Sequence, residues 1–262
     1  MSLVHASVVP HPPLLIPAIG KENLSRLAAT AESYRLLAKK LTDDNIDTIV
    51  IISPHGIIQS NVFTMNLNPQ FSCNFKDFGD FATKKTWNGN IALTHRIRES
   101  LETKAPLQLI SAEELDHGAS VPLYLLTEKL PAVKIIPIYY SGLSNEAHFQ
   151  FGELLKREFL VNRDRVAVIA SGDLSHRLTK DAPAGYSPKG KKFDQKIQEC
   201  LLKNRFRDIV EIDRHLTMDA GECGLKSILI LLGILDGIKH EPKLLSYEYP
   251  FGVGYLAMDF EL

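Results

Sequence analysis

The sequence predicts a single-domain α/β protein built as a three-layer sandwich, with a largely parallel central sheet and helices on both faces. Short runs rich in Val and Ile recur along the chain, and segments with helical periodicity separate them. Such alternation is typical of stacked β-α units. The length of 262 residues, with no repeat, low-complexity tract or linker, favours one domain over residues 1–262.

The expected central strands are continuous apolar runs, which indicates burial on both faces of the sheet. They cover residues 4–9, 48–52, 133–140 and 166–170. Two runs near the end of the chain, 242–249 and 253–260, are interpreted as closing strands. Segment 61–84 mixes Phe, Asn and Gly with alternating character and is interpreted as an antiparallel hairpin or a long loop.

Helices are expected between these strands, where apolar residues recur with a helical period. The segments are 25–41, 90–101, 121–130 and 146–159. Beyond residue 166 the pattern changes to a loop at 179–191 that is rich in Pro, Gly and Lys, followed by helices near 193–203 and 224–235.

Composition excludes several classes of partner. Lys and Arg total 30 against 31 for Asp and Glu, which leaves no charge excess to attract nucleic acid or an anionic membrane. The longest apolar stretch, 228–235, is far shorter than the ~20 residues that a bilayer requires. Three cysteines without a CxxC pair, and no basic leader, favour a reducing compartment, so we expect a cytoplasmic protein. The near-zero net charge favours a small neutral or acidic substrate. The sequence leaves open whether the protein forms a homo-oligomer.

Four histidines lie at or near the ends of expected strands, where ligands bind in open α/β sheets. His11 stands in VVPHPP after the first strand, and His55 stands in SPHG after the second. The flanking prolines stiffen both turns. His176 follows the strand VAVIAS, and His117 lies in EELDHGAS just before a helix.

Glu222 and Cys223 occur at the expected start of the helix that continues as SILILLG. A helix N-terminus favours an anionic side chain and lowers a thiol pKa, so either residue is a candidate metal ligand. Two imidazoles and one carboxylate leave coordination positions open, as in non-haem Fe(II) oxygenases. A closed structural zinc site would need four protein ligands and typically more cysteine.

Simpler interpretations exist for each residue. A single histidine at a strand end is more often a hydrogen-bonded loop residue than a ligand. Glu222 is equally suited to capping a helix, and Cys223 to filling a small apolar space. His176 could bridge the backbone beside Asp173. His11 and His55 reinforce each other because they follow separate strands.

With these residues in place, the chain resembles the class III, LigB-type extradiol ring-cleaving dioxygenase superfamily, and within it the Memo-like branch associated with AMMECR-type domains. The resemblance rests on six segments that run the length of the chain: VVPHPPLLIPAIG (8–20), ISPHG (52–56), DHGASVPL (116–123), SGDLSHRL (171–178), AGECGLKSI (220–228) and FGVGYLA (251–257). Each segment alone is weak, but six in the right order are specific.

The resemblance implies roles for the candidate residues. His11 and His55 would bind Fe(II), with Glu222 as the third ligand, while His176 would act as acid and base and His117 would hydrogen-bond the substrate. In Memo proteins a cysteine before a glycine supplies the third contact, and Cys223 matches it. Consecutive residues entering a helix point ~100° apart, so Glu222 and Cys223 cannot easily reach one metal together. We expect Glu222, with Cys223 as the alternative.

The leading hypothesis is a non-haem Fe(II) dioxygenase that opens a catechol-type ring with O₂. The second is a Memo-like metal-binding protein without dioxygenase activity, acting with an AMMECR-type or radical-SAM partner. Zinc, copper or manganese could replace iron, and a thiolate ligand would favour a softer metal. A metal hydrolase is a third interpretation, since it needs only a metal-bound water and a base.

Overall fold

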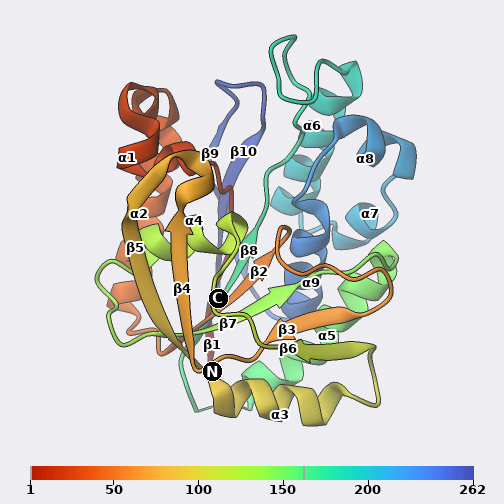
Figure 1. Cartoon of the computed structure of the whole chain (residues 1–262). Coiled ribbons are helices and arrows are strands. Elements are labelled where there is room, and N and C mark those ends of the chain that lie inside the picture. Colours follow the sequence, from red (N-terminus) through yellow and green to blue (C-terminus); the bar gives the residue numbers. More distant parts are fainter. Residues whose placement is uncertain (1, 162) are drawn as a thin grey trace.

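The structure is a computed structural model that describes residues 2–161 and 163–262. Its central feature is one sheet with helices packed on both faces (Figure 1). The strands are β1 (Leu3–Val9), β2 (Thr48–Ser53), β3 (Phe63–Asn66), β4 (Gln70–Phe75), β5 (Asp80–Gly89), β6 (Leu107–Ile110), β7 (Lys134–Tyr139), β8 (Val166–Ser171), β9 (Glu241–Glu248) and β10 (Tyr255–Glu261). The helices are α1 (Pro17–Gly20), α2 (Ala28–Asp43), α3 (Ile91–Leu101), α4 (His117–Leu126), α5 (Asn145–Leu160), α6 (Pro188–Leu202), α7 (Phe206–Val210), α8 (Arg214–Ala220) and α9 (Leu225–Leu235).

The sheet is mixed, which corrects the prediction of a largely parallel one. Its main path runs β4-β5-β7-β2-β8-β1-β10-β9, and the strands from β5 to β1 along this path pair in parallel. The β9–β10 and β4–β5 pairs are antiparallel, and so are β1 with β10 and β3 with β7. Only six residues, 249–254, join β9 to β10, which is too short for the crossover that a parallel pair needs.

Alternation along the central strands divides the apolar residues between two cores. On β2, Ile49 and Ile51 face the core beneath α2 and α4, whereas Val50 and Ile52 face the core beneath α5 and α9. All four side chains are fully buried. The continuous apolar run in the sequence therefore reflects a strand covered on both faces, as predicted.

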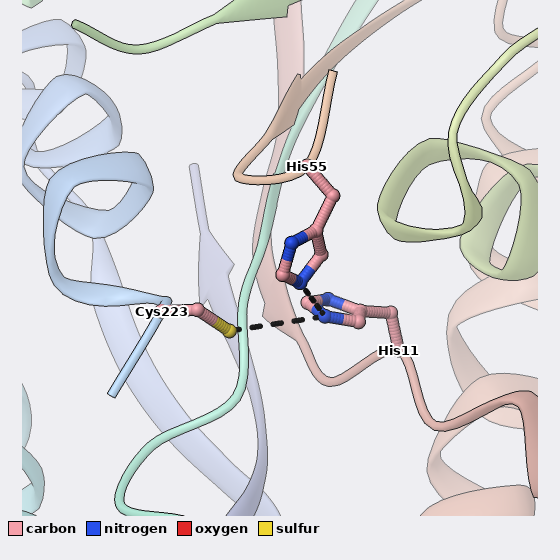
Figure 2. Close-up of side chains that lie close together, drawn as sticks. All are labelled: His11, His55 and Cys223. Carbon is pink, nitrogen blue, oxygen red and sulfur yellow. Dashed lines mark hydrogen bonds between the residues drawn. The ribbon is translucent and has the colours of Figure 1, made fainter. Parts of the chain in front are cut away.

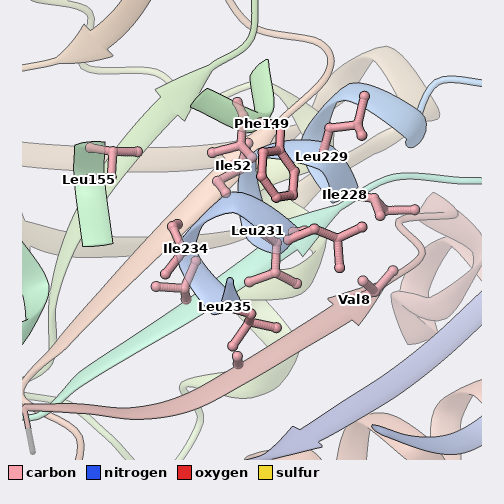
Figure 3. Close-up of a cluster of buried hydrophobic side chains, with 14 of the residues drawn as sticks. Val8, Ile52, Phe149, Leu155, Ile228, Leu229, Leu231, Ile234 and Leu235 are labelled. Carbon is pink, nitrogen blue, oxygen red and sulfur yellow. The ribbon is translucent and has the colours of Figure 1, made fainter. Parts of the chain in front are cut away.

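The second core is centred on α9, whose residues are buried from Ser227 to Leu235 (Figure 3). This helix packs against α5 at very short range. A Cβ added to Gly233 would lie 1.9 Å from the carbonyl oxygen of Phe149, and one added to Gly152 would lie 2.1 Å from that of Ile230. The two glycines thus allow the helix backbones to touch, which fixes α9 relative to α5.

Several elements differ from the sequence expectations. The segment 61–84 contains β3, β4 and the start of β5, and β4 pairs with β5 as the expected antiparallel hairpin. Strand β6 and helices α7 and α8 were not predicted, because they are short and lack a clear period. Helix α4 starts at His117 rather than at 121, so His117 belongs to its first turn. Within the described ranges, no helix combines the length and apolar character needed to cross a membrane.

Candidate metal centre

The candidate site lies beyond the carboxyl ends of three neighbouring strands. β1, β8 and β2 are adjacent and parallel, so the segments that follow them meet at one edge of the sheet. His11 follows β1 and His55 follows β2, while Asp173 and His176 follow β8. Cys223 reaches the same place from the segment that precedes α9.

His11, His55 and Cys223 bring their ligand atoms together. Figure 2 shows the three side chains pointing toward a common point. The Nε2 atoms of His11 and His55 are 3.0 Å apart, and the sulfur of Cys223 lies 3.8 Å from Nε2 of His11. All three ligand atoms lie within 4.8 Å of one another. One cation held by two nitrogens and one sulfur fits this spacing, since Zn–N and Zn–S bonds measure about 2.0 to 2.3 Å.

The ring of His11 is oriented by Ser171 at the end of β8. The Ser171 hydroxyl donates to the carbonyl oxygen of Gly118, so toward Nδ1 of His11, 2.9 Å away, it can only accept. Nδ1 therefore carries the ring proton, and the lone pair of a neutral ring is on Nε2, the atom that faces His55 and Cys223. The backbone N–H of His11 donates to Asp173 at 2.9 Å, which fixes the turn itself.

A second group of ligand atoms overlaps the first. Asp173, His176 and Cys223 also lie within 4.8 Å of one another. Oδ2 of Asp173 is 4.0 Å from Nε2 of His176 and 3.8 Å from Nε2 of His11. The sulfur of Cys223 is 3.8 Å from Nε2 of His176. A carboxylate and a third imidazole therefore border the group formed by His11, His55 and Cys223.

The backbone holds Cys223 against the loop after β8. The N–H groups of Cys223 and Gly224 both donate to the carbonyl oxygen of Asp173, at 3.3 and 2.9 Å. The N–H of Asp173 donates in return to the sulfur of Cys223 at 3.3 Å. A Cβ on Gly172 would lie only 2.2 Å from Cα of Gly224, so a glycine is required for this close approach.

Glu222 does not join either group. Its carboxylate Oε2 accepts a hydrogen bond from the N–H of Leu225 at 2.6 Å and so caps the first turn of α9. Burial raises the pKa of Glu222 to about 7. Of the two candidates for the third ligand, the residue that the structure brings to the histidines is Cys223, the alternative, and Glu222 has the capping role.

His117 lies beside the ligand atoms as the first residue of α4. Its ring stacks on that of His55, with centroids 4.3 Å apart and an angle of 19° between the planes. Phe78, from the turn between β4 and β5, lies edge-on at 5.3 Å. The Asp116 carboxylate caps the helix by accepting from the N–H of Ala119 at 3.1 Å. His117 therefore lies at the edge of the site with its ring packed against His55 and Phe78.

Burial sets the protonation of these groups. It lowers the pKa of His11 well below its usual value and that of His55 to about 3, with the neighbouring imidazoles contributing in the same direction. Both rings are thus neutral at neutral pH, as a metal ligand must be. Burial also raises the pKa of Asp173 to about 6 and that of Cys223 well above its usual value. A bound cation would reverse this effect on the thiol, because coordination deprotonates it.

Sequence reasoning missed two residues of the site. Asp173 was noted only as a neighbour of His176, and Ser171 was not considered. Ser171 ends β8 and Asp173 follows two residues later, so the signal that identified His11 and His55, a polar residue at the end of a buried strand, was also present in them.

Comparisons with known proteins show the family to which the chain belongs. Residues 5–258 match the family model described as the catalytic LigB subunit of aromatic ring-opening dioxygenase. Protein CA_C1420 of Clostridium acetobutylicum is 33% identical over 271 residues, and the chain spans 58% of its length. The 3,4-dihydroxyphenylacetate 2,3-dioxygenase of Escherichia coli is 24% identical over 242 residues, which cover 87% of each chain.

One solved structure shares the fold. The uncharacterized protein JW3007 from Escherichia coli K12 superposes with a TM-score of 0.73 and 18% sequence identity. The match covers 98% of this chain and 99% of the other. The likeness therefore extends over the whole sheet and its helices.

Proposed function

Because this chain belongs to the LigB family of aromatic ring-opening dioxygenases, we propose that it is a metal-dependent dioxygenase that opens a small catechol-like ring with O₂. The observation that carries the proposal is the convergence of His11, His55 and Cys223 within 4.8 Å, at the strand ends where the family resemblance expects a metal. A relative that is named as a dioxygenase of an aromatic diol supports the substrate class.

The donor set fits a divalent transition metal. His11 and His55 offer neutral nitrogens, and Cys223 offers a sulfur that ionises on coordination. Asp173, 3.8 Å from His11, adds a carboxylate that can bind the metal or hold the imidazoles. We propose Fe(II) as the native metal, with zinc, copper or manganese as the other candidates. Bound Fe(II) would supply the electronic link between the diol and O₂.

His176 and His117 are proposed to act on the substrate. The His176 side chain is 28% exposed and its Nε2 faces Asp173, so it reaches both the ligand group and the solvent. It can take a proton from a diol hydroxyl and return it to the product, with Asp173 balancing the charge of the imidazolium. His117, at the edge of the ligand group and in contact with His55 and Phe78, would hydrogen-bond the oxygens of the substrate.

The proposal is tested by reconstituting the protein with Fe(II) under anaerobic conditions, measuring its metal content and then following oxygen uptake. The substrate panel is catechol, 3,4-dihydroxyphenylacetate and 3,4-dihydroxybenzoate. We expect about one iron per chain and uptake with at least one diol. His176→Phe should abolish oxygen uptake and leave the iron content unchanged, because His176 is proposed to transfer protons and not to bind the metal. Bound iron without uptake from any diol would contradict the dioxygenase.

The Cys223 thiol favours a second candidate. A thiolate makes the site softer than two imidazoles and a carboxylate, and suits copper or zinc better. The second proposal is a Memo-like metal-binding protein without dioxygenase activity that acts with an AMMECR-type or radical-SAM partner. The Clostridium relative has additional chain beyond the matched region, which leaves room for such a partner. Stoichiometric copper or zinc binding, together with absent oxygen uptake by the iron form, would favour it.

A further inference from the structure

A cavity lies beside the segment that carries Leu178, on the side of α6 and β9. Its volume is about 410 Å³, and it is lined by Leu178, Tyr186, Lys191, Gln195, Tyr247 and Tyr249. Ligand cavities in proteins typically measure about 300 to 1,000 Å³, so this space is large enough for a molecule with one ring. None of the six lining residues belongs to the groups of candidate metal ligands in the described chain.

Three of the six residues that line the cavity are tyrosines. Tyr247 lies near the end of β9, and Tyr249 directly follows the strand, which ends at Glu248. Their ring centroids are 5.8 Å apart. Tyr186 comes from the loop before α6 and is 55% exposed, and Tyr249 is 46% exposed. Partly exposed aromatic rings around a cavity offer apolar area that a flat ring can cover.

The deepest tyrosine is held rigidly. The Tyr247 hydroxyl donates to Oδ2 of Asp194 at 2.7 Å, and the other carboxylate oxygen accepts from the N–H of Ser175 at 2.9 Å. Asp194 is fully buried. A wall that is already fixed by a buried carboxylate loses little further freedom when a ligand binds.

One positive charge stands at this cavity. Lys191 is the only charged residue of the six that line it, and in the part of the chain that the structure describes it has no ion-pair partner. Gln195 lies four residues further along α6, on the same face of the helix. The cavity therefore combines flat apolar walls with an unpaired ammonium group and an amide, which together recognise a ring that bears a negative charge.

We propose that this cavity binds a small aromatic molecule with an anionic substituent, at a site separate from the metal centre. The ring would lie against Tyr247 and Tyr249, and its carboxylate or phosphate would contact the ammonium group of Lys191 and the amide of Gln195. Leu178, which lines the cavity, is two residues from His176, so an occupant would contact the segment that carries the proposed acid and base.

The test is a calorimetric titration of the full chain with four probes. Benzoate and phenyl phosphate carry both the ring and the charge, and they distinguish a carboxylate ligand from a phosphate ligand. Benzyl alcohol lacks the charge, and cyclohexanecarboxylate lacks the flat ring. We expect saturable binding of one molecule per chain for at least one aromatic anion, and binding weaker by about tenfold for the two controls.

Variants locate the binding. Lys191→Gln should weaken the binding of the aromatic anion by about tenfold, because it removes the charge-assisted contact. Lys192→Gln removes the same charge from the next, exposed residue of α6, which does not line the cavity, and should leave binding unchanged. Tyr249→Ala should weaken the binding of the aromatic anion. Because Tyr249 is 46% exposed, the truncation should have little effect on the stability of the fold. His55→Ala should have no effect, which separates this site from the metal centre.

Two results would overturn the proposal. One is the absence of saturable binding for both aromatic anions. The other is binding that His55→Ala abolishes and Lys191→Gln does not, since this would place the molecule at the metal centre. Neither result depends on whether the protein opens aromatic rings, so the inference and the proposed function fail independently.

Discussion

Ser171 holds the ring of His11 through a 2.9 Å hydrogen bond between Oγ and Nδ1, and this contact decides which ring nitrogen faces Cys223. The two residues are 160 positions apart in the sequence and meet because β1 and β8 are neighbours. A partner that orients a ligand is part of a metal site as much as the ligand is.

Replacing Ser171 with Ala should weaken metal binding. The change leaves Nδ1 of His11 without its acceptor, so neither the tautomer nor the orientation of the ring is fixed, and we expect the metal affinity to fall by about 10- to 100-fold. The measurement is a titration with Zn²⁺ against a chromophoric chelator. Ser33→Ala removes a buried hydroxyl on α2 that bonds to Ser246 and contacts no candidate ligand, and it serves as the control. Equal affinities for the two variants would contradict the orienting role.

The third ligand can be identified by a pair of adjacent substitutions. If Cys223 is the third ligand, as proposed, Cys223→Ser should lower the metal affinity by an order of magnitude or more, because it removes the thiolate bond to the metal. Glu222→Gln should leave the metal affinity close to that of the wild type and reduce the free energy of unfolding by about 1 kcal/mol, because it weakens the cap of α9. The same chelator competition, with a urea denaturation for each variant, gives both quantities. The opposite ranking of metal affinities would assign the ligand to Glu222.

Gly233→Ala should destabilise the protein. The new Cβ would lie 1.9 Å from the carbonyl oxygen of Phe149, so α5 and α9 must separate, and we expect a loss of about 1 to 3 kcal/mol in the free energy of unfolding. Gly79→Ala is the control, since nothing lies within 4 Å of its new Cβ. Its positive φ of +82° should lower the free energy of unfolding by about 1 kcal/mol when Ala replaces Gly. A smaller loss at Gly233 than at Gly79 would argue against the close helix contact.

His5 should make stability fall with acid. Burial, followed by the charge of Lys40, lowers its pKa to about 3, and both ring nitrogens lack a hydrogen-bond partner in the described structure. The unfolded chain binds a proton at His5 below about pH 6.5 and the folded chain does not, so folding loses stability as the pH falls from 6.5 toward 3.

His5→Leu removes this proton binding. Between pH 6.5 and pH 5 the wild type should lose about 2 kcal/mol relative to the variant, which corresponds to about 1.4 kcal/mol per pH unit. Urea denaturation at each pH measures the difference. Ser7→Ala, a buried and non-titrating change on the same strand, should give a difference that does not vary with pH. A flat difference for His5→Leu as well would show that this imidazole is not kept neutral by the fold.

Much of the architecture could be predicted because burial leaves a local pattern. The runs at β1, β2, β7 and β8 are apolar on both faces, and helical periods between them indicate the covering layers. The mixed edges could not be predicted in the same way. Whether β10 pairs with β1 or with another strand depends on contacts between residues far apart in the chain. An apolar run has the same pattern in a parallel and in an antiparallel strand, so the pattern does not predict the orientation.

By itself, the sequence determined which residue types follow each buried strand, and so placed His11 and His55 on stiff turns at one edge of the sheet. Which of Glu222 and Cys223 lies beside the two histidines was decided by the tertiary structure. Neighbouring residues entering a helix point about 100° apart, and the phase of α9 is fixed by its packing against α5 and by the bonds from Cys223 and Gly224 to the Asp173 carbonyl. Those contacts are long-range, so no local pattern contains them.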